Sequence, residues 1–395
     1  MEDVIEEIAM GPFGSNIKVD CFVDSGVPVL NGSNLQGFKL NEESFNYVTE
    51  EKANSLNKAI AHRGDIVITH RGTLGQIVYI PSDSQYQRYV ISQSQFRVRL
   101  NTQIALPQFV VYFFHTRIGQ HRLLANASQV GVPAIARPST TFKTVPIELP
   151  SLEEQMRIVG ILDSLSIKIE LNNRINQNIE EQAILLVNNF LSSNIALSSP
   201  QRSLADVCTK ITDGSHFSPK DEPSSSIPMY SVKDMGTYGF NYGKCKHISA
   251  EDYQDMVRND CVPKVGDVLV AKDGSYLKEL FVNVKQTKQA ILSSIAIFRP
   301  NPEYISPELL LYLLKQPRIL QEVKDNYVSG SALPRIVLKD FKKLSFCLPP
   351  AEEQCEIRAL LSSMYMTIQK NQTENHALAS CRDELLSHLI IGKNS

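Results

Sequence analysis

Two loop clusters carry side chains that can form directional hydrogen bonds with another molecule. The candidates are His70, Arg71, Thr73, Gln76, Gln93, Gln95, Gln129 and Arg137 in the first half, and Lys272, Asp273, Ser275, Tyr276, Lys278, Ser329, Ser331 and Arg335 in the second. Arginine and lysine suit O6 and N7 of guanine, and glutamine suits N6 and N7 of adenine. Each side chain taken singly could equally be a solvated loop residue, so the expectation rests on the clusters.

Motifs typical of catalytic sites are missing from the sequence. It has no glycine-rich loop ending in Gly-Lys-Ser/Thr, which would cradle nucleotide phosphates, and no Asn-Pro-Pro-aromatic run. Cys245 and His247 with Cys261 lack a standard zinc spacing, which favours packing thiols over metal ligands. Asp65 and Asp267 could be nuclease carboxylates, but the glycine before each favours a turn residue at the entry to a strand. We expect no catalytic centre, metal or cofactor in this chain.

Composition excludes several classes of protein. Hydrophobic residues make up 43% of the chain and charged residues 21%, as in an ordinary globular protein. No apolar run reaches the length that a bilayer requires, and the acidic start argues against a secretory or transit peptide. Seven cysteines without a C-x-x-C spacing indicate reduced thiols. We expect a cytoplasmic protein with no membrane partner.

The sequence repeats itself at an offset near 200 residues, which indicates a tandem duplication. Matching landmarks occur in the same order in both halves. They are residues 64–68 with 266–270, 27–29 with 227–229, Pro107 and Tyr112 with Pro307 and Tyr312, and Leu-Pro…Glu-Glu-Gln ending at Gln155 with the same motif ending at Gln354.

Each repeat begins with about 150 residues of short apolar runs cut by Gly, Pro, Asn and Ser. This pattern predicts strands joined by exposed loops, with a helical stretch near residues 108–124 and again near 307–323. The predicted class is α+β. The expected parts are recognition domains at 1–150 and 203–350, spacer helices at 151–193 and 351–395, and a linker at 194–202.

The second part of each repeat has the heptad spacing of a long helix. We expect two antiparallel helices that form a coiled coil, related by a pseudo-twofold axis, with Gly392 at the end of the second. The seam positions are 158, 162, 165, 169, 172, 176, 179, 183, 186 and 190, then 357, 361, 364, 368, 371, 375, 378, 382, 385 and 389.

Asparagine interrupts both seams, at Asn172 and Asn176 and at Asn371 and Asn375. A buried asparagine lowers stability but fixes register, because a slipped pairing leaves its amide unsatisfied. The alternative is a frayed or solvent-facing stretch. The same lapse in both copies favours a polar layer.

Charge is divided unevenly along the chain, although the net charge is only −2. Residues 1–150 are neutral and 203–350 are basic, whereas both helical segments are acidic. This distribution could suit nucleic acid bound at two patches rather than over the whole surface. The alternative is that such small differences arise by chance, and charge alone favours that alternative.

Several motifs resemble those of the specificity subunits of type I restriction-modification systems, over essentially the whole chain. They are Gly-Pro-Phe-Gly-Ser at 11–15, Gly-Val-Pro-Val-Leu at 26–30 with Asn34 and Leu35, Asp-Gly-Ser-His at 213–216 with Pro219, the strand and glycine loop at 64–75, and the duplicated Leu-Pro…Glu-Glu-Gln. The second glycine loop departs from the pattern, since residues 272–275 read Lys-Asp-Gly-Ser without an arginine or a second glycine.

The resemblance implies a function. Two target recognition domains would each read half of a split, asymmetric site on double-stranded DNA. The helical spacer would dock two copies of a methyltransferase subunit, which use S-adenosylmethionine. Two endonuclease/translocase subunits, where present, would bring ATP and magnesium.

Two other functions compete with this interpretation. One is a stand-alone nuclease or methyltransferase with an unfamiliar site. The other is a tandem-repeat scaffold that binds proteins and does not recognise DNA. Incubation with DNA, magnesium and S-adenosylmethionine tests the first, and a DNA shift assay tests the second.

Overall fold

The computed structural model of the chain shows two units. Each unit contains one α+β domain and a segment of each of the two long helices. The structure describes residues 1–12, 16–128, 131–241, 243, 245–274, 276–330 and 334–391. Unit 1 consists of Met1–Ile169 and the chain from Ala377 onward, and unit 2 consists of Glu170–His376. The predicted fold class is confirmed, while the pseudo-twofold relation between the repeats stays a prediction.

Unit 1 contains a four-stranded antiparallel sheet, a five-stranded sheet and a hairpin. The four-stranded order is β1-β9-β6-β7, formed by Ile5–Met10, Gln95–Leu100, Ile66–Thr69 and Ile77–Tyr79. The five-stranded order is β2-β4-β3-β8-β5, formed by Phe22–Val23, Asn46–Val48, Val27–Val29, Arg88–Val90 and Ile60–His62. The hairpin joins β10 (Ala127–Ser128) and β11 (Ala134–Ile135), and the domain helices are α1 (Glu50–Ser55), α2 (Pro107–His115), α3 (Arg117–Leu124) and α4 (Pro138–Thr144).

Unit 2 repeats this plan with a smaller second sheet. Its four-stranded order is β13-β21-β18-β19, formed by Cys208–Asp213, Ile295–Pro300, Val268–Ala271 and Leu280–Val282. The three-stranded order is β17-β14-β20, formed by Lys246–Ile248, Ile227–Tyr230 and Ala290–Ile291. Strand pairs join β12 (Gln201–Ser203) to β24 (Ser345–Cys347), β15 (Met235–Gly236) to β16 (Gly239–Phe240), and β22 (Val328–Ser329) to β23 (Arg335–Ile336). Its helices are α6 (Asn194–Leu197), α7 (Leu204–Val207), α8 (Ala250–Arg258), α9 (Pro307–Leu314), α10 (Pro317–Asn326) and α11 (Leu338–Phe341).

The strands before the candidate loops, β6 and β18, are buried at every position because both faces of their sheet are covered. In β18, Val268 and Val270 face one hydrophobic cluster while Leu269 and Ala271 face another. Neighbouring side chains in a strand point to opposite faces, so two covered faces produce a continuous apolar run. These buried strands provide a rigid base for the loops that follow them.

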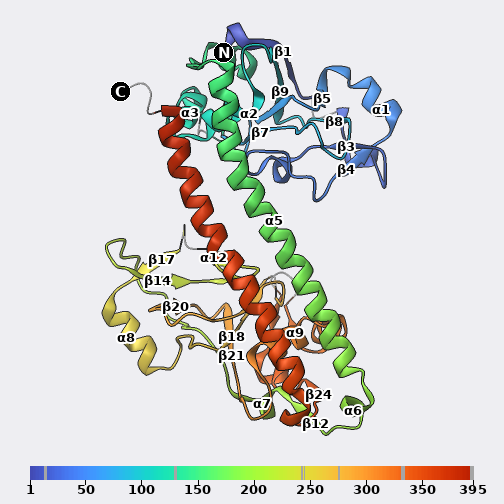
Figure 1. Cartoon of the computed structure of the whole chain (residues 1–395), viewed down its shortest axis with the longest axis vertical. Helices are drawn as coiled ribbons and strands as arrows, with labels where there is room; N and C mark the ends of the chain where they lie inside the picture. Colours follow the sequence, from blue (N-terminus) through green and yellow to red (C-terminus); the bar gives the residue numbers. More distant parts are fainter. Residues whose placement is uncertain are drawn as a thin grey trace. The chain divides into compact units, whose positions relative to one another are not determined.

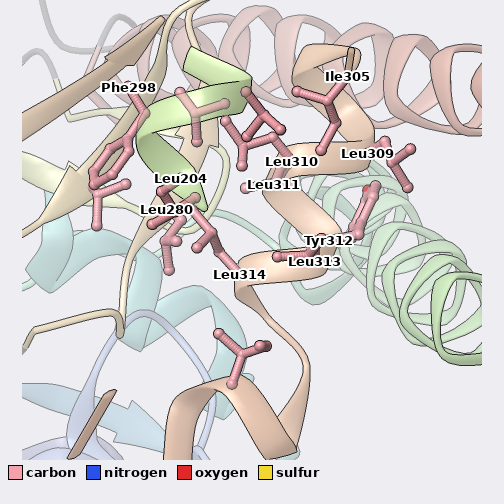
Figure 2. Close-up of a cluster of buried hydrophobic side chains, with 14 of the residues drawn as sticks. Leu204, Leu280, Phe298, Ile305, Leu309, Leu310, Leu311, Tyr312, Leu313 and Leu314 are labelled. Atoms are coloured by element: carbon pink, nitrogen blue, oxygen red, sulfur yellow. The ribbon is translucent and has the colours of Figure 1, made fainter. Parts of the chain in front are cut away.

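Helix α9 fills the core of unit 2 beside this sheet. Ser306 caps its first turn by accepting from the Leu309 N–H at 3.2 Å, and Pro307 suits the first helical position. Figure 2 shows the leucines of α9 gathered with Leu204, Leu280 and Phe298, which come from α7, β19 and β21.

The helical stretches predicted near 108–124 and 307–323 are each two helices rather than one. Between α2 and α3, the Thr116 hydroxyl donates to the Phe113 carbonyl and accepts from the Gly119 N–H, at 2.7 and 3.0 Å. In unit 2 the break falls before Pro317, whose ring cannot continue the preceding helix.

The two long helices are α5 (Leu152–Leu191) and α12 (Cys355–Ile391), labelled in Figure 1. In unit 1, Ile158 and Leu162 near the start of α5 pack with Leu386 near the end of α12. In unit 2, Val187 near the end of α5 lies in one cluster with Leu361 near the start of α12. The helices are therefore antiparallel, and every predicted seam position is buried or half-buried.

Helices α5 and α12 lie within the segments 151–193 and 351–395. Ala351–Gln354 forms a 3₁₀ turn before α12, and Gly392 lies outside the described residues. No helix in the described part of the chain is long and apolar enough to cross a membrane.

The glutamine of each Leu-Pro…Glu-Glu-Gln motif fastens a long helix to its domain, a role that the sequence did not reveal. The buried Gln155 amide accepts from the Leu106 N–H and donates to the Ile104 and Pro150 carbonyls, at 2.9 Å each. In unit 2, the Gln354 amide donates to the carbonyls of Tyr304 and Pro349 at 2.8 and 2.6 Å.

Candidate nucleic-acid interface

The candidate loop of unit 1 is held against the β10–β11 hairpin. Arg71 lies opposite Ala134 in an antiparallel bridge, flanked by backbone hydrogen bonds of 2.8 and 2.9 Å. On its other side the loop meets the turn at 92–95, where the His70 N–H donates to the Ser94 carbonyl at 2.8 Å. The fold thus brings together three segments that are well separated in sequence.

Arg71, Thr73, Gln93 and Arg137 are exposed at or near this junction. Within the described part of the chain, the Arg71 side chain has no hydrogen-bond partner. His70 is half-buried, and its Nε2 lies 3.2 Å from the Gln93 carbonyl oxygen. Burial lowers the pKa of His70, which favours the neutral ring. Arg71 and Arg137 are therefore the exposed cations at this surface, and Arg71 is the one in the bridge itself.

Two predicted glutamine contacts are used within the protein. Gln95 is 1% exposed and accepts from the Ser92 N–H at 2.9 Å, so its burial disfavours the predicted contact with DNA. Gln76 is half-buried, with Nε2 donating to the Gly32 carbonyl and Oε1 accepting from Thr69, at 2.9 and 3.0 Å. Its amide braces the loop.

Unit 2 builds the same junction with different side chains. Asp273 lies opposite Arg335 in an antiparallel bridge, flanked by backbone hydrogen bonds of 2.8 and 3.0 Å. Arg335 Nε lies 3.7 Å from Asp273 Oδ1, with 56% of the arginine side chain and 18% of the aspartate side chain exposed. The Lys272 N–H donates to the Ser294 carbonyl at 3.0 Å, as His70 does to Ser94 in unit 1.

The Lys272 side chain is also used within the protein, so its contact with DNA stays a prediction. Its side chain is only 10% exposed and forms an ion pair with Asp213 at the end of β13. The other oxygen of Asp213 lies 3.3 Å from Nε2 of His216, which is 77% exposed. The lysine charge is therefore used to join the loop to β13.

The remaining candidates divide by exposure. Lys278 and Ser329 are exposed, whereas Tyr276 is half-buried and packs against the unit 2 core. Gln129, Ser275 and Ser331 lie outside the described residues, as do Phe13, Gly14 and Ser15 of the first glycine motif.

Asp65 and Asp267 are structural residues, as the turn interpretation predicted. Both are fully buried, and each accepts a backbone N–H three residues earlier, at 2.9 Å in Asp65 and 2.7 Å in Asp267. Each also forms a two-bond pair with an arginine, Asp65 with Arg99 at 2.8 and 3.1 Å and Asp267 with Arg299 at 2.8 Å twice. Neither carboxylate can reach a substrate.

The asparagines of the helix seams meet in a polar layer within unit 2. Asn172 Nδ2 donates to Asn375 Oδ1 at 2.9 Å, and Asn371 Nδ2 donates to Asn176 Oδ1 at 2.8 Å. Asn172, Asn176 and Asn375 are at most 6% exposed, which excludes a solvent-facing stretch. Their control of helix register stays a prediction.

The cysteine and histidine candidates do not assemble into a metal site. No group of three or more His, Cys, Asp or Glu in the described ranges is arranged to hold a metal ion. Burial raises the pKa values of Cys245 and Cys261, which disfavours the thiolate that binds metals.

Comparison with known proteins relates the whole chain to one family. Residues 14–181 and 200–379 match the model of the type I restriction modification DNA specificity domain. The type I restriction enzyme MjaIX specificity subunit of Methanocaldococcus jannaschii is 23% identical over 372 residues, covering 88% of this chain and 81% of that protein. The HindI specificity subunit of Haemophilus influenzae is 23% identical over 408 residues, covering 85% and 88%. The crystal structure of a type I S subunit from M. genitalium has the same fold, with a TM-score of 0.52, 15% identity and coverage of 98% and 94%.

Proposed function

The chain belongs to the family of type I restriction-modification DNA specificity proteins, and on that premise we propose that it recognises a bipartite, asymmetric site on double-stranded DNA. Domain 1–150 reads one half-site and domain 203–350 reads the other. One observation carries the proposal: the same loop–hairpin junction presents Arg71 opposite Ala134 in unit 1 and Asp273 opposite Arg335 in unit 2. Equal scaffolds with unlike side chains suit two unlike half-sites.

The exposed side chains at these junctions have the chemistry that base recognition requires. An arginine can donate two parallel hydrogen bonds to O6 and N7 of guanine in the major groove. Arg71 on its loop and Arg335 on its hairpin are both exposed, and short backbone hydrogen bonds fix the segments that carry them. Gln93 and Ser329 stand beside them and can add contacts to bases or phosphates.

The chain is a specificity component, and we place catalysis in its partners. Two methyltransferase subunits dock on the helical segments and bring S-adenosylmethionine, and endonuclease/translocase subunits bring ATP and magnesium. A subunit docked on the helices would cover the large apolar side chains that are exposed there: Met156 and Ile167 in unit 1, and Leu185 and Met366 in unit 2. These partners and their DNA place the complex in the cytoplasm.

The decisive test maps methylated sites genome-wide in cells that express the chain with its methyltransferase. A chimera with residues 1–150 from a relative should change one half-site and keep the other. The reciprocal chimera at 203–350 should do the opposite. If both halves change together, or neither changes, the two domains do not read DNA independently.

The scaffold alternative makes a different prediction, and the family match disfavours it. A scaffold would bind its partner but would not shift a DNA duplex with the partner present. The docking proposal predicts two methyltransferase copies per chain by native mass spectrometry. A stable one-to-one complex at saturating partner would contradict it.

A further inference from the structure

The two bridges that support the candidate loops have the same local geometry. In each bridge the backbone hydrogen bonds lie on either side of the facing residues rather than between them. Facing residues of this kind have Cα atoms about 4.5 Å apart, and their side chains project to the same face. The residue on the loop and the residue on the hairpin therefore occupy one small area of surface.

Each unit places one arginine in this area, but from opposite strands. Unit 1 has Arg71 on the loop and Ala134 on the hairpin. Unit 2 has Arg335 on the hairpin, while the loop position carries Asp273. The missing loop arginine of the second repeat is therefore replaced in space by an arginine 62 residues further along the chain.

The aspartate restricts the arginine without occupying its donor fork. The contact runs from Nε of Arg335 to Oδ1 of Asp273, at 3.7 Å. No described residue accepts a hydrogen bond from Nη1 or Nη2 of Arg335. Lys272 does not compete with Arg335 for Asp273, because the Lys272 ammonium group is paired with Asp213. The contact is electrostatic, because Oδ1 of Asp273 is buried and accepts no hydrogen bond from any described residue. It draws the Nε edge of the guanidinium towards the carboxylate and leaves the terminal nitrogens available.

We propose that Arg335 reads a guanine in the half-site of the second domain and that Asp273 is the positioning residue that aims it. Arg71 takes the same place in the first domain without a carboxylate beside it. The proposal rests on the proposed function, since it requires both junctions to face DNA. It adds that an arginine in the bridge reads the guanine whether the loop or the hairpin carries that arginine.

A carboxylate that positions Arg335 near DNA should affect overall affinity and base discrimination in opposite directions, which a merely structural carboxylate would not do. Asp273 adds a negative charge close to the DNA backbone, so it opposes binding to any sequence while it restricts Arg335. Asp273→Asn keeps the size of the side chain and removes that charge. The variant should bind unrelated duplexes more tightly, yet discriminate less at one base pair.

The test uses the full chain in complex with its methyltransferase and duplexes that carry the mapped site. Each base pair of the second half-site is substituted in turn, and competition binding is measured for the parent, R335A, R335K, D273N and D273E. R335A should lose about 10- to 100-fold of discrimination at one G·C pair and keep the first half-site unchanged. D273E should restore part of the preference lost in D273N. Lys324→Ala, on the exposed side of α10, serves as the control that changes neither half-site.

Three results would overturn the inference. Equal weakening of all sequences by R335A would make Arg335 a phosphate contact. A new preferred base in D273N would make Asp273 itself the reader. Absence of any sequence preference in the parent complex would refute the proposed function as well. The parent complex therefore distinguishes a failure of the proposed function from a failure of the Arg335 proposal alone.

A transplant in unit 1 tests the bridge position directly. R71A should lose preference at one base pair of the first half-site. R71D combined with A134R copies the unit 2 arrangement and should restore preference at that same base pair. If the double variant discriminates no better than R71A, the two bridges do not share a reading position.

Discussion

Replacing Gln155 with leucine should detach the base of α5 from the unit 1 domain. The side chain is fully buried, and its amide makes three hydrogen bonds of 2.9 Å to the backbone around Leu106, Ile104 and Pro150. Leucine has a similar volume but can make none of them. The substitution therefore removes hydrogen bonds without opening a large cavity.

The expected cost follows from the groups that lose their partner. Each buried polar group left unsatisfied costs about 1–3 kcal/mol, and burial of the leucine offsets part of this by about 1.5–3 kcal/mol. Three groups lose a bond, which costs about 3–9 kcal/mol, so the offset leaves a net loss of about 1.5–6 kcal/mol in the free energy of unfolding of unit 1. For a unit of this size, that corresponds to roughly 3–24 °C in Tm.

Thermal unfolding and amide hydrogen exchange measure this effect together. Gln155→Leu should lower the first unfolding transition and speed exchange at Leu106, whose N–H donates to the glutamine. Gln177→Leu is the matched control, because Gln177 is exposed on the same helix and bonds only to Glu181 one turn away. Unchanged Tm and unchanged Leu106 protection would show that the amide does not hold the helix to the domain.

Three further predictions concern the buried polar groups. Asn172→Leu should destabilise unit 2 by about 1–3 kcal/mol because the Asn375 oxygen loses its donor, and leucine at both positions should recover most of this in thermal melts; a neutral single variant would contradict the polar layer. Asp65→Asn should cost about 3–5 kcal/mol in chemical denaturation, because the buried carboxylate pairs with Arg99, and a loss below that of an exposed control would refute the pairing. Burial lowers the pKa of His115 below its ordinary 6.5, so the unfolded chain takes up this proton more readily. The stabilisation is present above the unfolded pKa and is lost as pH falls below it towards the folded pKa. His115→Gln should flatten the dependence of Tm on pH in this range. An unchanged slope would show that His115 does not contribute to this pH dependence.

The sequence alone determined the features that depend on local pattern. The duplication, the strand–loop–strand units and the heptad seams follow from periodicity, which each segment carries without reference to the rest of the chain. For the same reason the turn role of Asp65 could be predicted, because a glycine precedes it and an apolar strand follows. The polar layer was also predictable, since asparagines interrupt both seams in the same register.

Only the tertiary structure decided which loop side chains remain at the surface. Gln95 and Lys272 have the residue types of base readers, but the first turns inward to Ser92 and the second pairs with Asp213. The seam pattern marked Asn172 and Asn375, but not that they meet each other in the layer. Burial and ion pairing depend on segments that are far away in sequence, and no local pattern reports them.

The same reason explains the arginine of the second domain. In the sequence, Asp273 stands where the first repeat has Arg71, so the second loop lacks this arginine. Arg335 is one of many polar residues near the end of the domain. The hairpin places Arg335 opposite Asp273 in the loop, because strand pairing brings residues together irrespective of their separation along the chain. Residue types were therefore readable from the sequence, whereas their spatial partners were decided by the pairing of distant strands.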